Sequence, residues 1–212
     1  MDWRPGVNLE TIKKRARILQ NIRAFFLCSD CLEVNTPLLN QASNTDIYIE
    51  SIIACHSTQT FYLQTSPEFA MKRLLAAGFG SIYQICPAFR AEESGRKHRP
   101  EFTLLEWYRI GFNYQQLTDD VESLIQSLED DHQLFERIGY YELFDRYLGF
   151  NPELVDLTEL QSTCTRIVSG IDAQELDFDQ CLNVLLTVAI EPQMQGYQFV
   201  MDYPASQASL SK

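Results

Sequence analysis

The pattern of apolar and polar residues between positions 81 and 110 predicts a β-hairpin. Two apolar-rich segments, 81–89 and 101–110, flank a charged loop that contains Gly95. Strand side chains alternate with a period of two, so the even-numbered residues of both segments share one face. That face mixes apolar with polar side chains, namely Gln84, Cys86, Ala88, Arg90, Phe102, Leu104, Glu106, Tyr108 and Ile110. A structural hairpin usually has one clean apolar face, so the pattern fits either a salt-bridged surface hairpin or a ligand-binding one.

Helical periodicity predicts most of the remaining elements. A long helix begins after Asn8, which is a good cap, and extends to about residue 29. Further helices are expected over residues 67–78, 114–130, 140–149, 152–167 and 177–192. Ser66 is expected to cap the helix at 67–78, and Gly78 to end it. Strands are expected at residues 31–37, 46–50, 61–65 and 197–202.

The composition is that of an ordinary globular protein. The 212 residues are 45% hydrophobic and 22% charged, which suits one domain with a substantial core. There is neither a run of about 20 apolar residues nor an apolar signal core, so we expect a cytoplasmic protein and no membrane. Six cysteines without a disulfide rhythm suggest free thiols. Cys28 and Cys31 form a CxxC, but no second pair lies at a zinc-like spacing, so chance explains it better than a metal.

Charge is unevenly distributed along the chain. The net charge is −12, and residues 111–212 carry 18 Asp and Glu against 4 Lys and Arg. An acidic second half argues against broad nucleic-acid binding, because phosphates must be neutralised by cations. The clustered Arg and Lys of the first half are where an anionic ligand is expected. The basic run 13–17 on the first helix is either a solvated face or a surface for an acidic partner protein.

The hairpin sequence resembles a known family. FRAEESGRKHRPEF (residues 89–102) is similar to motif 2 of the class II aminoacyl-tRNA synthetases. The pattern HxPEFTxLEWY is closer to the lysine branch, and within it to the elongation factor P–(R)-β-lysine ligase family. This resemblance implies an α+β fold, an antiparallel β-sheet flanked by helices, with residues 1–212 forming the N-terminal portion of one catalytic domain. The helix and strand that end at Pro37 resemble motif 1, which implies a homodimer.

The resemblance also implies a reaction, an ATP-dependent ligase that activates lysine or β-lysine and transfers it to a lysine of elongation factor P. Arg90 would be the catalytic contact to the α-phosphate, where negative charge develops. Glu92 would meet the adenine or its ribose, and His98 and Arg99 would lie over the β- and γ-phosphates. Mg²⁺ would bridge phosphates, with no side chain assigned to it.

The lysine-like substrate would be held by four residues of this chain. The resemblance gives Ser66 and Glu68, in the segment TSPE, the task of reading an amino group, although capping of a helix explains the same residues. Glu106 and Tyr108 on the second strand complete the set, with carboxylates facing ammonium groups.

Departures from the family pattern leave two alternatives open. Ala91 replaces the usual Asn, and Arg99 replaces the Asn before the Pro. The glycine-rich motif 3 and its arginine are missing, which suggests a truncated form, and no anticodon-binding barrel precedes the first helix. The missing barrel favours the elongation factor P ligase, with no tRNA as partner. A lysine–tRNA ligase fragment and a non-catalytic remnant that binds a partner are the alternatives.

Overall fold

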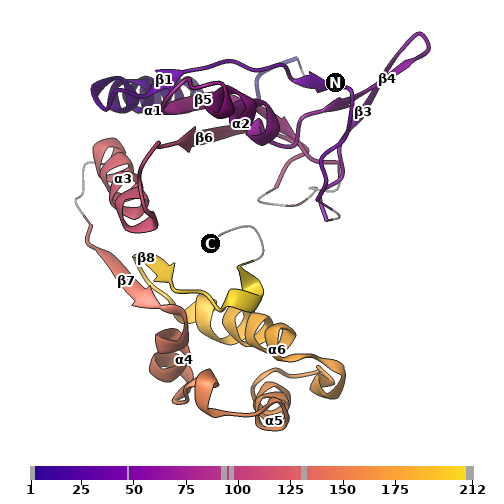
Figure 1. The fold of residues 1–212 in the computed structure, drawn as a ribbon, viewed down its shortest axis with the longest axis vertical. Coiled ribbons are helices and arrows are strands. Elements are labelled where there is room, and N and C mark those ends of the chain that lie inside the picture. Colours follow the sequence, from indigo (N-terminus) through magenta and orange to yellow (C-terminus); the bar gives the residue numbers. More distant parts are fainter. Residues whose placement is uncertain (1–2, 47, 92–94, 96–97, 130–132, 209–212) are drawn as a thin grey trace. The chain divides into compact units, whose positions relative to one another are not determined.

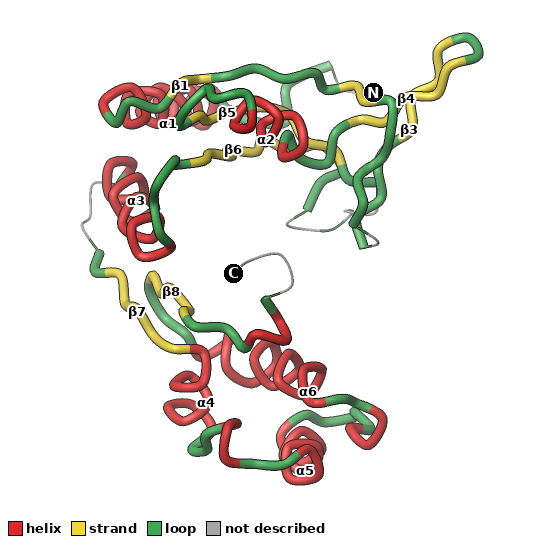
Figure 2. Tube along the Cα trace, in the orientation of Figure 1, coloured by secondary structure: helices red, strands yellow, loops and turns green. Residues whose placement is uncertain are grey.

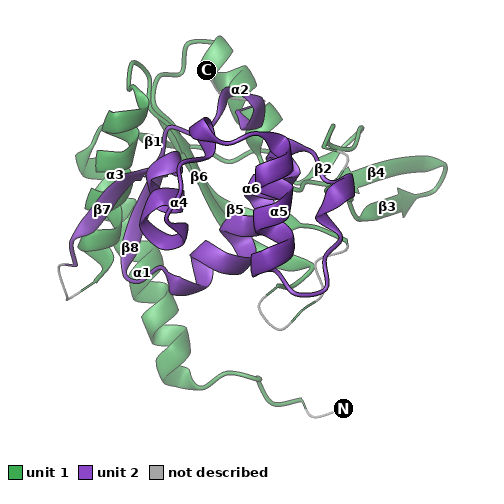
Figure 3. Ribbon diagram, turned by 90° about the horizontal axis from the view of Figure 1, so that it is seen from below, with its two compact units in different colours: residues 1–130 green, residues 131–212 purple. Residues whose placement is uncertain are grey.

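A computed structural model describes residues 3–46, 48–91, 95, 98–129 and 133–208. The chain divides into two compact units, residues 1–130 and residues 131–212 (Figure 3). Both units combine helices with small sheets, which confirms the α+β fold class. In the first unit the elements follow the order α1 (Leu9–Cys28), β1 (Leu32–Glu33), β2 (Leu39–Asn40), β3 (Ile53–His56), β4 (Gln59–Leu63), α2 (Glu68–Ala76), β5 (Ile82–Phe89), β6 (Glu101–Tyr108) and α3 (Tyr114–Leu128) (Figure 1).

The predicted hairpin is present as β5 and β6, which pair antiparallel along their whole length. Strand β1 adds to the other edge of β5 in parallel, giving the order β1-β5-β6. Strands β2, β4 and β3 form a separate antiparallel sheet, and Figure 2 shows the strands in yellow. In the hairpin register Gln84 lies opposite Glu106, and Ile82 lies opposite Tyr108. The even-numbered residues of the two strands therefore share one face, as the period of two predicts.

The odd-numbered face of the hairpin packs against helices. Phe26 of α1 is fully buried and stacks on Tyr83 of β5 with 4.3 Å between ring centroids. Leu105 and Trp107 of β6 join the same cluster, as does Leu124 of α3. The opposite, even-numbered face is mixed: Gln84, Glu106 and Tyr108 lie there among apolar side chains such as Ile82 and Ala88.

A buried ion pair joins β6, α3 and the end of α1. Arg109, directly after β6, donates from Nε and Nη2 to the two carboxylate oxygens of Asp120 at 2.8 and 2.7 Å. A third donor, Nη1, reaches the carbonyl oxygen of Ser29 at 2.8 Å, and Trp107 Nε1 donates to the same carboxylate at 3.1 Å. The side chains of Arg109 and Asp120 are only 5% and 9% exposed. The hydrogen bond to Asp120 raises the pKa of Arg109, which stays charged.

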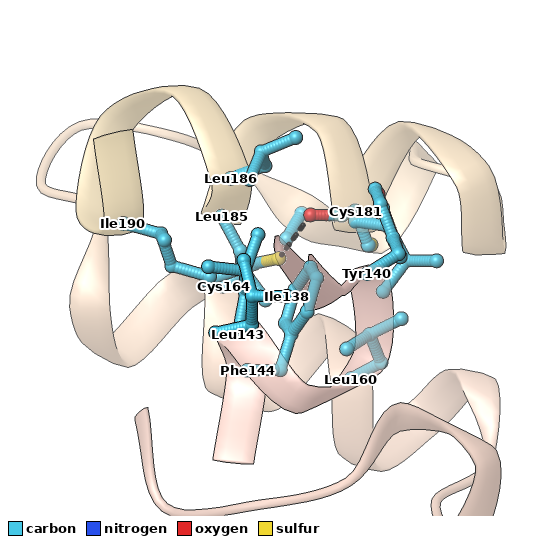
Figure 4. Packing of buried hydrophobic residues seen from close by; sticks show 12 residues of the cluster. Ile138, Tyr140, Leu143, Phe144, Leu160, Cys164, Cys181, Leu185, Leu186 and Ile190 are labelled. Atoms are coloured by element: carbon cyan, nitrogen blue, oxygen red, sulfur yellow. Dashed lines mark hydrogen bonds between the residues drawn. The ribbon is translucent and has the colours of Figure 1, made fainter. Parts of the chain in front are cut away.

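The second unit has a core of its own. Its elements are β7 (Phe135–Gly139), α4 (Tyr140–Leu148), α5 (Leu157–Ile167), α6 (Phe178–Leu185) and β8 (Tyr197–Met201), and β7 pairs with β8 in parallel. Helix α6 continues as a π-helical turn, Leu186–Ile190. Figure 4 shows side chains of α4, α5 and α6 gathered around Cys164, whose thiol lies 3.5 Å from the carbonyl oxygen of Cys181.

Several predicted elements are wrong in detail. The described residues of 46–50 form no strand, because Asp46 accepts a hydrogen bond from the Tyr48 N–H at 2.9 Å and makes a local turn instead. The strand predicted at 31–37 is reduced to β1. Ser66 does not cap α2: the cap position is Pro67, and no side chain makes a cap hydrogen bond there. The helix predicted at 152–167 is interrupted, because Asp156 caps a new helix, α5.

Other expectations are confirmed. Asn8 caps α1 by accepting from the Thr11 N–H at 2.8 Å. All six cysteines are free thiols, and four of them are buried, namely Cys31, Cys86, Cys164 and Cys181. Among the helices in the described part of the chain, none combines the length and the apolar character that a membrane span requires.

Candidate active site

The segment between β4 and α2 is fixed beside β5 by one buried glutamine. The Gln64 Nε2 donates to the carbonyl oxygen of Pro87 at 2.8 Å, and the Phe89 N–H donates to the Gln64 carbonyl at 2.9 Å. Ser66 follows in this segment and is partly buried. Glu68 opens α2, where its carboxylate accepts from Lys72 Nζ at 2.6 Å. The anchoring by Gln64 thus determines where the first turn of α2 lies relative to the hairpin.

Glu106 and Tyr108 form a hydrogen-bonded pair on the even face of β6. The Tyr108 hydroxyl donates to Glu106 Oε1 at 2.7 Å, and both side chains are partly buried. Burial raises the pKa of Glu106; the Tyr108 hydrogen bond and Lys72 act against this, and the charge of Glu68 adds to it. Burial, followed by the hydrogen bond to Glu106, raises the pKa of Tyr108, which stays protonated. Since Glu68 and Lys72 act on Glu106, α2 and the hairpin bring two carboxylates and one ammonium group together.

Gln84 lies on the same face, opposite Glu106 in the register, and is only 1% exposed. Its amide and Lys72 received no role from the sequence. The sequence does contain a feature that marks each residue. Gln84 is a single amide on the even face, and Lys72 follows Glu68 by four residues, which is one helical turn. What the sequence could not supply was the position of α2 over the hairpin.

Arg90 lies at the end of β5, farther along the same face toward the loop. Its backbone N–H donates to the Pro100 carbonyl at 2.9 Å, and its guanidinium lies 5.1 Å from the centroid of the Phe102 ring. The next residue, Ala91, donates its N–H to the Glu50 carbonyl at 2.9 Å. These contacts hold the start of the loop to both the hairpin and the segment before β3.

The described residues of the loop are exposed. His98 and Arg99 are exposed, and the Gly95 N–H donates to the His98 carbonyl at 3.1 Å. Glu92 lies outside the described residues. The assignment of Glu92, His98 and Arg99 to a nucleotide therefore stays a prediction.

The described residues do not supply a metal site. Among them, no group of three or more His, Cys, Asp or Glu side chains converges so as to hold an ion. The expectation that Mg²⁺ bridges the phosphates of a nucleotide, with no side chain assigned to it, stays a prediction.

The whole sequence matches a family described as tRNA synthetases class II (D, K and N), over residues 1–212. The chain belongs to this family of class II synthetases, and with it to the ATP-dependent ligases. It is 42% identical over 226 residues to the elongation factor P–(R)-β-lysine ligase of Vibrio vulnificus, covering 100% of this chain and 68% of that protein. The corresponding ligase of Pseudoalteromonas translucida is 42% identical over 219 residues, covering 99% of this chain and 67% of the relative.

Proposed function

We propose that this protein activates β-lysine or lysine with ATP and transfers the acyl group to a lysine of elongation factor P. The two relatives named elongation factor P–(R)-β-lysine ligase support this substrate and acceptor. The structural observation that carries the proposal is the Glu106–Tyr108 pair, bonded at 2.7 Å, near enough to Glu68 of α2 that the charge of Glu68 raises the pKa of Glu106. Two neighbouring carboxylates suit a substrate that bears two ammonium groups.

The four substrate residues divide into two parts. Glu106 is partly buried, so an ion pair with an ammonium group there is stronger than at the surface. Tyr108 orients the carboxylate by its hydrogen bond. Ser66 and Glu68, from the segment that Gln64 anchors, would face the other amino group.

The first chemical step is the formation of an acyl-adenylate. An oxygen of the substrate carboxylate attacks the α-phosphorus of ATP, the bond to the β-phosphate oxygen breaks, and pyrophosphate leaves. Arg90 would contact the α-phosphate, because a guanidinium can donate two parallel hydrogen bonds to phosphate oxygens. Glu92 would contact the adenosine, and His98 and Arg99 would contact the outer phosphates. Mg²⁺ would arrive with the nucleotide and supply positive charge to its phosphates, with no side chain of the described residues assigned to hold it.

The second step forms an isopeptide bond. The amine of the acceptor lysine, in its neutral form, attacks the acyl carbon, AMP leaves with the bonding electrons, and the amine loses a proton. Positioning of the two reactants is the main demand on the protein in this step. An acceptor protein rather than a tRNA suits residues 111–212, which carry 18 Asp and Glu against 4 Lys and Arg.

The remaining features of the proposal concern the assembly. We expect both units to belong to one catalytic domain and the enzyme to act as a homodimer in which the exposed Pro37 takes part. A cytoplasmic location suits the six free thiols.

The test is the mass of elongation factor P after incubation with the purified enzyme, ATP and Mg²⁺. (R)-β-Lysine and lysine are compared as substrates, and lysine tRNA is offered in a parallel reaction that measures acid-precipitable charging. A mass increase of one acyl group on the factor, with uncharged tRNA, is expected. Efficient charging of tRNA with an unmodified factor would instead identify a lysine–tRNA ligase. Absence of both products would favour a non-catalytic role.

A further inference from the structure

Gln84 has an unusual environment for an amide. It is the third residue of β5 and is 1% exposed. Neither its Oε1 nor its Nε2 has a hydrogen-bond partner among the residues that the structure describes. Cys86 lies two residues along the same face. Burial raises the pKa of its thiol and the Gln84 amide acts against this, but a thiol is a weak hydrogen-bond partner. Native proteins leave few buried polar groups unsatisfied, and each such group calls for an explanation.

A purely structural role does not account for this side chain. Gln64, a buried glutamine in the same region, has such a role: its Nε2 donates to the Pro87 carbonyl at 2.8 Å and connects two segments of the chain. Gln84 makes no comparable connection within the described part of the chain. An apolar residue of the same size would fill its place without leaving two polar atoms unpaired.

The position of Gln84 points to what it would bind. It is the register partner of Glu106, and side chains directly opposite in an antiparallel pair have Cβ atoms about 4.5–5.5 Å apart. A single ammonium group can therefore donate to both the Glu106 carboxylate and the Gln84 Oε1 at about 2.9 Å. We propose that Gln84 is a substrate-binding residue, whose Oε1 accepts a hydrogen bond from the same ammonium group that Glu106 binds. This inference rests on the proposed function, in which the substrate is lysine-like.

The balance of charge explains why an amide suits this position better than a third carboxylate. The formal charges of Glu68, Glu106 and Lys72 sum to −1, and Lys72 pairs with Glu68 at 2.6 Å. A substrate with two ammonium groups and one carboxylate is +1 and neutralises them. Glu at position 84 would add a buried negative charge opposite Glu106, whose burial already favours the neutral form. An amide supplies the acceptor without that charge.

The decisive variant is Gln84→Leu, measured in amino-acid-dependent exchange of pyrophosphate into ATP with the purified enzyme. The KM for the lysine-like substrate should rise about 10- to 100-fold, as for the loss of a hydrogen bond to a charged group, and the KM for ATP should not change. The melting temperature should stay the same or rise, because an unpaired buried amide is removed. The control Gln64→Leu loses the bond to Pro87, and its melting temperature should fall.

Two competitive inhibitors identify the ammonium group. Norleucine lacks the side-chain amine of lysine, and 6-aminohexanoate lacks the amine next to the carboxylate. Gln84→Leu should raise the Ki of one of them about as much as the KM of the substrate and leave the Ki of the other unchanged. Two results would overturn the inference while the proposed function stands. One is an unchanged KM for the substrate. The other is a raised KM with a lower melting temperature and equal effects on the Ki of both inhibitors. If neither lysine nor β-lysine supports pyrophosphate exchange by the wild-type enzyme, the proposed function itself fails.

Discussion

Glu106 must be ionised to bind an ammonium group, whereas burial favours its neutral form. The hydrogen bond from Tyr108 at 2.7 Å and the charge of Lys72 act in the opposite direction. The raised pKa of Glu106 therefore gives the proposed substrate site a pH dependence that a freely exposed carboxylate would show only at lower pH.

We predict that the KM for the lysine-like substrate rises as pH falls through the raised pKa of Glu106, because the neutral carboxyl cannot pair with an ammonium group. Glu106→Gln should have a high KM that no longer changes over this pH range. The control Glu101→Gln removes an exposed carboxylate from the start of the same strand and should keep the wild-type profile. The measurement is pyrophosphate exchange at a series of pH values. A wild-type profile in Glu106→Gln would exclude this carboxylate from substrate binding.

The raised pKa of the Glu106 carboxyl also leads to a prediction about stability. A carboxyl whose pKa is raised on folding contributes stability below its unfolded pKa, and that contribution is lost as pH rises through the folded pKa. Without substrate, Glu106→Gln should thus be at least as stable as the wild type at neutral pH, and it should lose this advantage in acid. Urea denaturation at both pH values measures the difference. A variant that is less stable at neutral pH would show that the ionised Glu106 stabilises the free fold.

Arg90 allows the proposed catalytic contact to be separated from simple charge. Loss of one preorganised donor to a developing charge typically lowers kcat about 10²- to 10³-fold. We expect Arg90→Ala to lose at least this much in adenylate formation, and Arg90→Lys to recover only part of it, because a lysine has no guanidinium fork. The KM for the amino acid should change little in both variants. Pyrophosphate exchange at saturating substrate measures the loss, and nearly full activity of Arg90→Ala would remove the residue from the reaction.

At the scale of elements, the β5–β6 hairpin depends on how its two faces are covered. Its odd face is held by α1 and α3, and the Arg109–Asp120 pair connects β6 to both helices. The even face, with the proposed substrate residues, has no freedom to rotate away once the odd face is packed. The ion pair is thus a structural element that supports the site without lying in it.

We predict that Asp120→Ala lowers the free energy of unfolding by about 3–5 kcal/mol, the usual cost of leaving one charge of a buried pair without its partner. The loss is large because Arg109 is only 5% exposed and would keep its charge. The double variant Arg109→Met/Asp120→Leu should recover much of this stability, since no buried charge is then unpaired. Urea denaturation of the single and double variants measures both effects. A double variant as unstable as Asp120→Ala would show that packing, and not the unpaired charge, is what matters.

The elements also show how far the sequence could be used to predict the structure. The hairpin followed from two apolar-rich segments around a charged loop. The shared face of Glu106 and Tyr108 followed from the alternation of side chains in a strand, because the pairing of β5 with β6 is continuous. The strand predicted at residues 46–50 was wrong because a local side-chain hydrogen bond replaces strand pairing: the Asp46 carboxylate accepts from the Tyr48 N–H. Strand β7 (Phe135–Gly139) was missed because the adjacent charged residues Glu136 and Arg137 interrupt the alternation of apolar and polar positions. The roles of Gln84 and Lys72 depend on which elements meet, and that information is not local.

At the scale of the whole molecule, the described residues form two hydrophobic clusters that share no residue. The cluster around Phe26 belongs entirely to residues 1–130, and the cluster around Leu182 belongs entirely to residues 131–212. Sequence periodicity did not indicate this division, because it shows which residues of an element are buried but does not show which elements bury one another. Each unit thus has its own source of stability, and their membership of one catalytic domain stays a prediction.

The separation of the cores leads to a prediction about Leu182, which is fully buried in α6. Leu182→Ala removes most of a buried side chain and should cost about 2–5 kcal/mol, mainly in the second unit. Hydrogen exchange should become faster at amides of residues 133–208 and should change little in β5 and β6. The control Leu154→Ala changes a side chain that is 83% exposed and should alter neither. The exchange rates, followed peptide by peptide, separate the two units. Equally accelerated hydrogen exchange in the β5–β6 hairpin would show that the two cores unfold as one cooperative unit. A substitution far along the chain from Glu106 would then destabilise the proposed substrate face as well.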